Sequence, residues 1–183
     1  CFQYDRPETP ELEKYCETVR YYKRETGLAS LLSLKPYIVK SRQSAELLKN
    51  LQSDNFPVLF EGLHTCLYLN HASLRHRKLI YRESNIEHEY YFNLFKGEKS
   101  LSRKLFFLTE SLKLRLFQKQ LKYSTTMLVV SETDTAYLAS QFPDNRVVYL
   151  PSFHGNSIVK TEHGKGLYVL YHGNLSVVEN ALA

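Results

Sequence analysis

The side chains best suited to chemistry stand in two short stretches of the chain. His64 lies two residues after Gly62, so an imidazole able to exchange protons near neutral pH stands close to a position where a ligand can approach the backbone. Further along, the run 82–91 (RESNIEHEYY) groups ionisable and amide side chains at the start of an expected helix, whose dipole favours bound anions. Together the two stretches predict a site that includes His64, Arg82, Asn85, Glu87 and His88.

Each of these residues also has an ordinary structural interpretation. A single His is more often part of the packing than of a site. Ser84 and Glu87 are three residues apart, which is the spacing of a capping box at the start of a helix. A residue that directly follows a helix cap needs no amide, so Asn85 stays open to both interpretations.

The elements that must position these residues follow from the hydrophobic pattern. Short apolar runs at 57–61, 78–82, 126–130 and 147–150 predict buried parallel strands, and 19–22 is a weaker strand candidate. Helical spacing predicts helices over 41–52 and 101–121, from Ser84 onward, and after a cap at Ser131. This alternation predicts an α/β fold with a doubly wound, mostly parallel Rossmann-like sheet, which binds ligands beyond the carboxyl ends of its strands.

The pattern also predicts the domain organisation. Residues 1–151 are expected to form one Rossmann-like domain, followed by a glycine- and histidine-containing linker over 152–166. A new strand is expected to start at Leu167, and the chain ends soon after Asn174, so residues 167–183 read as the start of a second domain. Because the chain starts at Cys1 rather than Met and ends within an unfinished strand–helix unit, we expect it to be truncated at both ends.

Composition and missing motifs narrow the class of protein. Hydrophobic residues make up 43% and charged residues 23%, as in ordinary globular domains. No apolar stretch approaches the ~20 residues of a spanning helix, and no signal peptide opens the chain, which together favour the cytoplasm. The motifs of dinucleotide-binding, P-loop, zinc-protease and serine-hydrolase proteins are missing, and three unpaired cysteines predict no metal site.

One segment carries the excess positive charge. Between residues 99 and 122 there are seven Lys or Arg against one acid, Glu110, which leaves a local net charge of +6. A leucine stripe runs through the same helix, at Leu101, Leu105, Leu108, Leu112 and Leu116. The ordinary interpretation is a helix that packs by this stripe and exposes a basic face. The functional one is docking on an anionic membrane, with these residues facing it: Arg103, Lys104, Lys113, Arg115 and Lys119.

Four segments resemble a known family. FEGLHTCLYL (60–69), RESNIEHEYY (82–91), YLPSFH (149–154) and LYHGNLSVVEN (170–180) are similar to a Bacteroidetes group of two-Rossmann-domain (GT-B) glycosyltransferases, akin to the large retaining group one, or family four, class. The resemblance covers nearly the whole chain. Its most specific part is N-I-E-H-x-Y-Y followed by Y-H-G-N-L-S.

The resemblance implies an enzyme that transfers a sugar from a nucleotide-diphosphate sugar to a glycan or lipid-linked acceptor. Transfer would retain anomeric configuration without a metal or other cofactor, and the chain alone would be inactive. His64 would be catalytic, and Gly173 with Asn174 would bind the donor. The acceptor would meet Arg82, Asn85, Glu87 and His88.

Two points qualify this expectation. Ser84 stands where relatives carry His, and a hydroxyl cannot act as a base near neutral pH. The alternative hypothesis is a non-catalytic module that binds a membrane surface or polyanion through the basic helix over 99–122. No nucleic-acid-binding motif accompanies the charge, so a nucleic-acid partner is not expected.

Overall fold

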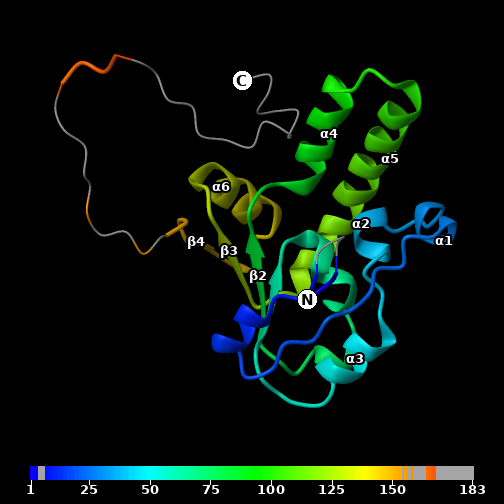
Figure 1. Cartoon of the computed structure of the whole chain (residues 1–183), viewed down its shortest axis with the longest axis vertical. Coiled ribbons are helices and arrows are strands. Elements are labelled where there is room, and N and C mark those ends of the chain that lie inside the picture. Colours follow the sequence, from blue (N-terminus) through cyan, green and yellow to red (C-terminus); the bar gives the residue numbers. More distant parts are fainter. Residues whose placement is uncertain (4–6, 154, 156–157, 159–163, 168–183) are drawn as a thin grey trace. The chain divides into compact units, whose positions relative to one another are not determined.

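The computed structural model describes residues 1–3, 7–153, 155, 158 and 164–167 (Figure 1). Contacts divide the chain into two units, Cys1–Ser152 and Phe153–Ala183. The strand predicted to start at Leu167 lies, after that residue, outside the described residues, and so do Gly173 and Asn174. The first unit holds all the helices and strands that the structure describes.

The core of the first unit is a sheet of four parallel strands. In chain order they are β1 (Val58–Glu61), β2 (Leu79–Glu83), β3 (Thr126–Val129) and β4 (Arg146–Tyr149), and they lie side by side in that same order. The four predicted apolar runs therefore match the four strands to within one residue at each end. The α/β class and the parallel sheet are confirmed. Of the weaker candidate over 19–22, only an isolated parallel bridge between Tyr22 and Phe2 forms.

Helical segments connect the strands. η2 (Leu63–Tyr68) and η3 (Ala72–Leu74), both 3₁₀ helices, lie between β1 and β2. The next connection holds α4 (Glu87–Gly97), α5 (Leu101–Phe117) and η4 (Gln118–Tyr123), and α6 (Glu132–Gln141) leads to β4. Before β1 come η1 (Pro10–Lys14), α1 (Leu28–Leu31), α2 (Tyr37–Lys40) and α3 (Ala45–Leu51).

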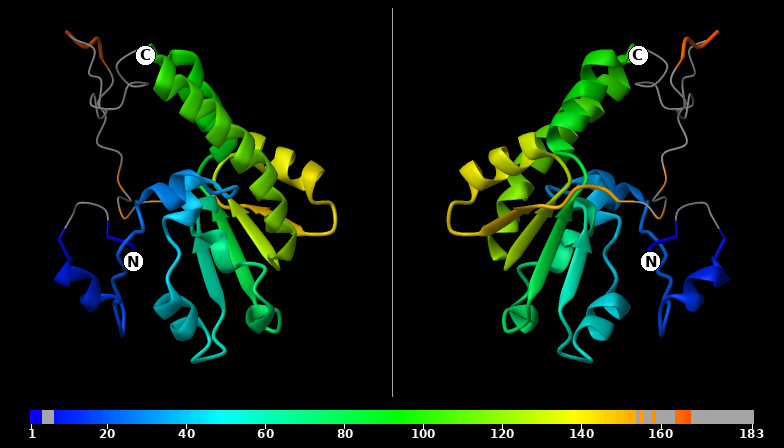
Figure 2. Two further views of the ribbon diagram at one scale, coloured as in Figure 1. Left: turned by 90° about the vertical axis from the view of Figure 1, so that its right-hand side faces the viewer. Right: turned by 90° about the vertical axis from the view of Figure 1, so that its left-hand side faces the viewer.

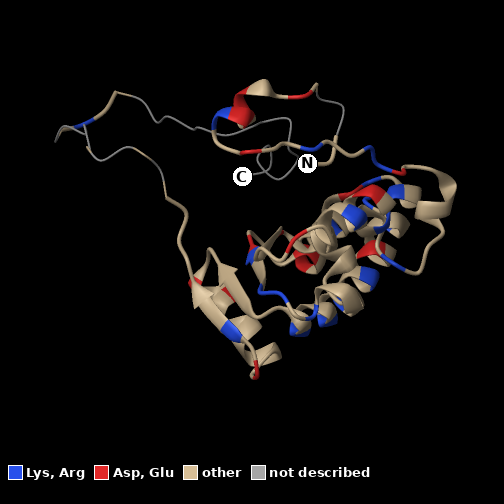
Figure 3. Cartoon of the chain, turned by 90° about the horizontal axis from the view of Figure 1, so that it is seen from below, with Lys and Arg blue, Asp and Glu red and all other residues tan. Residues whose placement is uncertain are grey.

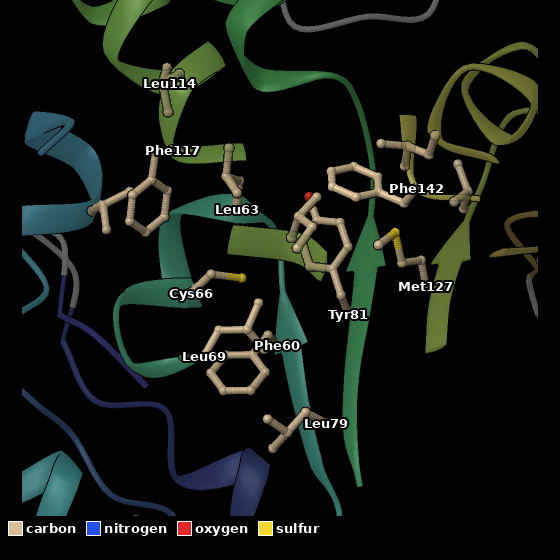
Figure 4. Close-up of a cluster of buried hydrophobic side chains, with 14 of the residues drawn as sticks. Phe60, Leu63, Cys66, Leu69, Leu79, Tyr81, Leu114, Phe117, Met127 and Phe142 are labelled. Carbon is tan, nitrogen blue, oxygen red and sulfur yellow. The ribbon is translucent and has the colours of Figure 1, made fainter. Parts of the chain in front are cut away.

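Every buried strand side chain lies on one face of the sheet. Because alternate residues of a strand point to opposite faces, the register places one set of buried side chains together: Phe60, Leu79, Tyr81, Glu83, Met127 and Val129. Cys66, Leu69 and Phe142 pack against this set from the connecting segments (Figure 4). On the opposite face Leu59 remains 55% exposed. Within the described part of the chain, the second covered face of a doubly wound sheet is not seen.

Local hydrogen bonds decide where the helices begin. Ser131 Oγ accepts from the backbone N of Asp134 at 3.4 Å and opens α6, as predicted. Helix α3 begins at Ala45 rather than at Ser41, because Ser44 is the residue whose hydroxyl accepts from Leu47 N at 3.1 Å. The capping box predicted at Ser84 is wrong: α4 begins at Glu87 and makes no side-chain cap hydrogen bond.

Helices α4 and α5 form an antiparallel hairpin that projects from the sheet (Figures 1 and 2). At its base Glu110 of α5 is fully buried. Its carboxylate accepts from the backbone N of Tyr37 at 2.5 Å and from Lys113 Nζ at 2.9 Å, which fastens α5 to the start of α2. No described helix combines the length and apolar character needed to cross a bilayer.

Helix α5 packs against the protein, as the ordinary interpretation expects, but most of the leucine stripe stays exposed. Leu101 is 84% exposed and Leu116 is 65% exposed. The buried residues of α5 are instead Glu110, Ser111, Leu114 and Phe117, on the other side of the helix. The orientation of the hairpin relative to the sheet decides which side of α5 is buried, and the spacing of the leucines does not.

Candidate functional site

The candidate site begins at the carboxyl end of β1, where the chain turns sharply at Gly62. This glycine has φ 76° and ψ 155°, a conformation that only glycine adopts readily. Its backbone N donates to the carbonyl of Arg82 at 2.9 Å, so the ends of β1 and β2 are held together. The turn leads directly into η2, which carries His64.

His64 and Glu87 meet across two consecutive strand-to-helix connections. His64 Nδ1 lies 3.1 Å from Glu87 Oε1. Glu87 is the first residue of α4, and its side chain is 12% exposed, while that of His64 is 32% exposed. The carboxylate thus fixes the orientation of the ring and leaves part of it open to solvent. A His–carboxylate pair of this kind can accept a proton from a hydroxyl group.

The end of β2 carries a buried carboxyl group, Glu83, which is the last residue of the strand and was not among the predicted site residues. It is 1% exposed. The hydroxyl of Tyr81 donates to its Oε2, and the backbone N of Asn85 donates to its Oε1 at 3.2 Å. The alternation of β2 contained the signal: Leu79, Tyr81 and Glu83 share one face, but the predicted strand stopped at residue 82.

Burial changes the proton affinity of this group. Removal from water raises the pKa of Glu83 to about 8, and the nearby negative charges of Glu87 and Asp134 act in the same direction. The Glu83 carboxyl is therefore mostly protonated at neutral pH. It can act as a hydrogen-bond donor in a place where an ionised carboxylate can only accept.

The thiol of Cys66 belongs to the same buried region. Its Sγ donates to the carbonyl of Gly62 at 3.6 Å, and its side chain is fully buried. Burial first, and then the charge of Glu83, raises the pKa of this thiol. Cys66 consequently supports the turn and is not an activated nucleophile.

Three other predicted residues are placed apart from the His64–Glu87 pair. Arg82 lies on the opposite face of the sheet from Glu83 and forms an ion pair with Glu61, its neighbour in register on β1. Asn85 is exposed, and its Oδ1 accepts from Ser84 Oγ at 3.3 Å. Ser84 thus contacts its neighbour instead of a helix N-terminus.

His88 takes part in a separate polar network between α4, η4 and α6. His88 Nδ1 lies 3.1 Å from Gln118 Oε1, and Gln118 Nε2 donates to the hydroxyl of Tyr137 at 3.2 Å. Burial is the main cause that lowers the pKa of His88, so its ring is largely neutral near pH 7. Two hollows of about 350 and 420 Å³ adjoin this network and share Arg115 and Tyr137 in their linings.

The five residues predicted to face a membrane differ in their surroundings. Lys113 is engaged by buried Glu110, while Arg103 Nη1 lies 3.9 Å from Glu98 Oε2. Lys104 lies over the ring of Phe95. Arg115 and Lys119 both line the hollow of about 420 Å³.

In the part of the chain that the structure describes, no group of three His, Cys, Asp or Glu side chains could hold a metal ion. The comparisons with protein-family models, with curated proteins and with solved structures found no match to this chain. The geometry at the carboxyl ends of β1 and β2 is therefore the basis of the functional proposal.

Proposed function

We propose that this chain is the acceptor-side domain of a cytoplasmic GT-B glycosyltransferase, which transfers sugar from a nucleotide-diphosphate sugar to a glycan or lipid-linked acceptor. The observation that carries the proposal is the contact between His64 and Glu87. It lies at the edge of a parallel sheet where α/β enzymes bind their substrates. The resemblance of the surrounding sequence segments supports the same assignment.

In this proposal the His64–Glu87 pair positions the acceptor hydroxyl and removes its proton. When the glycosidic bond forms, the bond from the anomeric carbon to the diphosphate oxygen breaks and the hydroxyl proton must leave. His64 accepts this proton at Nε2, while Glu87 faces Nδ1 and keeps the ring oriented. Glu83, which is buried and mostly protonated at neutral pH, adds no second negative charge near Glu87.

The donor side of the proposal concerns the second unit. Gly173 and Asn174 would bind the nucleotide sugar. The transfer would retain anomeric configuration and need no metal. Asn85, which is exposed just after β2, would contact the acceptor. Arg82 lies on the other face of the sheet, where it pairs with Glu61.

The test uses the uninterrupted gene product and a panel of uridine- and guanosine-diphosphate sugars. Calorimetry measures donor binding, and release of the nucleotide measures turnover. We expect one donor to bind, and His64→Gln and Glu87→Gln to lower turnover by about a hundredfold while donor affinity is kept. His76→Gln is the matched control, because His76 is exposed and forms its hydrogen bond with Asn55, away from Glu87.

The outcomes separate the parts of the proposal. A folded gene product that binds no nucleotide sugar contradicts the glycosyltransferase assignment. A donor that is bound and consumed equally fast by the His64 and Glu87 variants leaves the enzyme class standing and removes the role of the pair.

A further inference from the structure

The α4–α5 hairpin carries an apolar surface that faces away from the protein. On α5, Leu101, Leu105, Leu112 and Leu116 are 84%, 63%, 55% and 65% exposed, and the half-buried Leu108 lies between them in the same stripe. These residues recur at helical spacing, so they line one side of the helix. Five leucines in register on one exposed side of a helix form a continuous patch, not a scatter of single residues.

Helix α4 extends this patch with aromatic side chains. The rings of Phe92 and Phe95 stack with their centroids 5.6 Å apart. Phe92 lines one hollow together with Leu108 and Leu112, which shows that the two helices contribute to the same surface. We call it the hairpin surface: Phe92, Phe95, Leu101, Leu105, Leu108, Leu112 and Leu116.

Basic side chains border the hairpin surface. The ammonium group of Lys96 lies 4.7 Å from the ring centroid of Phe92, and that of Lys104 lies 5.3 Å from that of Phe95. Arg115 lines both hollows at the base of the hairpin, and Lys119 lines the one that contains Leu116. In Figure 3 Lys and Arg recur along the helices.

The acids near the hairpin surface offset little of this charge. Glu98 accepts from the backbone N of Lys99 and of Ser100 and so caps the turn between the helices. Glu110 lies on the buried side of α5, where it is fully enclosed. Glu89 is the one acid in the lining of either hollow. The border of the hairpin surface is therefore positive overall.

We propose that the hairpin surface docks on an anionic lipid bilayer. Its leucines and phenylalanines enter the boundary between headgroups and acyl chains, while Lys96, Lys104, Arg115 and Lys119 meet lipid phosphates. A helix with an apolar side and a basic border lies in the plane of the membrane surface. This inference does not depend on the proposed enzymatic function.

The charge pattern favours a bilayer over two other occupants. A second copy of the chain, packed through the same surface, would bring two positive borders together, which is unfavourable. A nucleic acid would satisfy the basic groups but would leave the exposed leucines without an apolar medium. An anionic bilayer satisfies both the charges and the apolar side chains.

The test measures binding of the purified chain to vesicles made of equal parts phosphatidylglycerol and phosphatidylcholine, and to vesicles of phosphatidylcholine alone. The apolar variant is Leu105→Ser with Leu112→Ser. Its matched control is Leu28→Ser with Leu32→Ser, which changes two leucines that are 75% and 81% exposed on and beside α1. All four positions are exposed, so circular dichroism is expected to show unchanged folding.

The charge variant is Lys104→Gln with Arg115→Gln, and the exposed Lys14→Gln with Lys49→Gln is its control. We expect the native chain to bind the anionic vesicles and the apolar variant to lose about tenfold or more in partitioning. The charge variant is expected to lose about twenty-fivefold, roughly fivefold for each of the two cations removed. Both controls keep native binding.

Three results would overturn the proposal. The first is equal vesicle binding by the apolar variant and its control. The second is a native dimer that the apolar variant converts to a monomer, which assigns the hairpin surface to a second copy. The third is binding to heparin that is unaffected by the leucine changes, together with no vesicle binding, which assigns the charge to a soluble polyanion.

Discussion

The imidazole of His64 lies directly against the backbone of Gly62. A Cβ placed on this glycine would stand 2.6 Å from Cε1 and 2.8 Å from Nδ1 of the ring. Gly62 therefore serves the site in two ways. It takes a backbone conformation closed to other residues, and it leaves the space that the His64 ring occupies when it turns toward Glu87.

We expect Gly62→Ala to lower the free energy of unfolding by about 1–3 kcal/mol, because the new methyl group strains the backbone and pushes the ring away. Urea titration measures this loss. Gly97→Ala is the control, since nothing lies within 4 Å of a Cβ at Gly97. If both alanine variants unfold at the same urea concentration, the turn at Gly62 is not strained by a side chain.

The buried Glu83 makes stability depend on pH. Its pKa is about 8 in the folded chain against 4.5 for a free side chain, so between these values the unfolded chain loses the proton while the folded chain keeps it. The stability that the folded chain gains from holding this proton is fully present below about pH 4.5. It falls by about 1.4 kcal/mol per pH unit as pH rises and is gone above pH 8.

Glu83→Gln tests this dependence. Its amide matches a protonated carboxyl, so it can still bond with Tyr81 and Asn85 at every pH. We expect the difference in unfolding free energy between the variant and the native chain to grow from about pH 5 to about pH 8 in favour of the variant. A difference that stays constant across this range would mean that Glu83 is ionised in the fold.

Glu110 fastens the hairpin to the rest of the molecule. Replacing Glu110 with Ala removes the acceptor of Tyr37 N and the partner of Lys113, and we expect it to cost about 2–4 kcal/mol of stability. Thermal and urea unfolding measure the cost. Glu46→Ala, at an exposed position in the first turn of α3, is expected to cost less than about 1 kcal/mol. Equal costs would show that the Glu110 contacts contribute nothing.

Arg77 closes the loop between α3 and β1. It is 7% exposed, and its guanidinium donates to the carbonyls of Leu51 and Phe56 and to the carboxylate of Asp54. Because a lysine cannot reproduce this planar set of donors, Arg77→Lys should lower the unfolding free energy by about 1–3 kcal/mol. Arg75→Lys, at an exposed site, should leave it unchanged. The same loss in both variants would contradict this account.

Much of the sheet could be predicted from the sequence because its signals are local. Each strand is a short apolar run that ends at polar residues, and Ser131 carries its own capping signal. The capping box predicted at Ser84 does not form, because its side chains make other contacts in the fold. Glu87, the acid of the box, contacts His64 of another connection, and the Ser84 hydroxyl donates to Asn85 Oδ1. The prediction that the leucine stripe of α5 packs against the protein was also wrong, because periodicity does not say which side of a helix the protein covers.

Part of the candidate site followed from topology alone. Parallel strands end at one edge, so residues after β1 and β2 had to lie near each other, and His64 with Glu87 do. Arg82 and His88 were grouped with them only by proximity in sequence. Arg82 precedes Glu83 in a strand and so faces the other way, and His88 turns toward Gln118 of another connection. Side-chain direction separates residues that stand next to one another in the chain.

The burial of Cys66 gives the protein an internal reporter of unfolding. Cys1 and Cys16 are exposed and will react with a thiol reagent at once, whereas Cys66 can react only when the core beneath Gly62 opens. The third equivalent of reagent consumed therefore measures the rate of that opening, with no added label. A folded sample and one that has lost its core can be told apart by counting thiols.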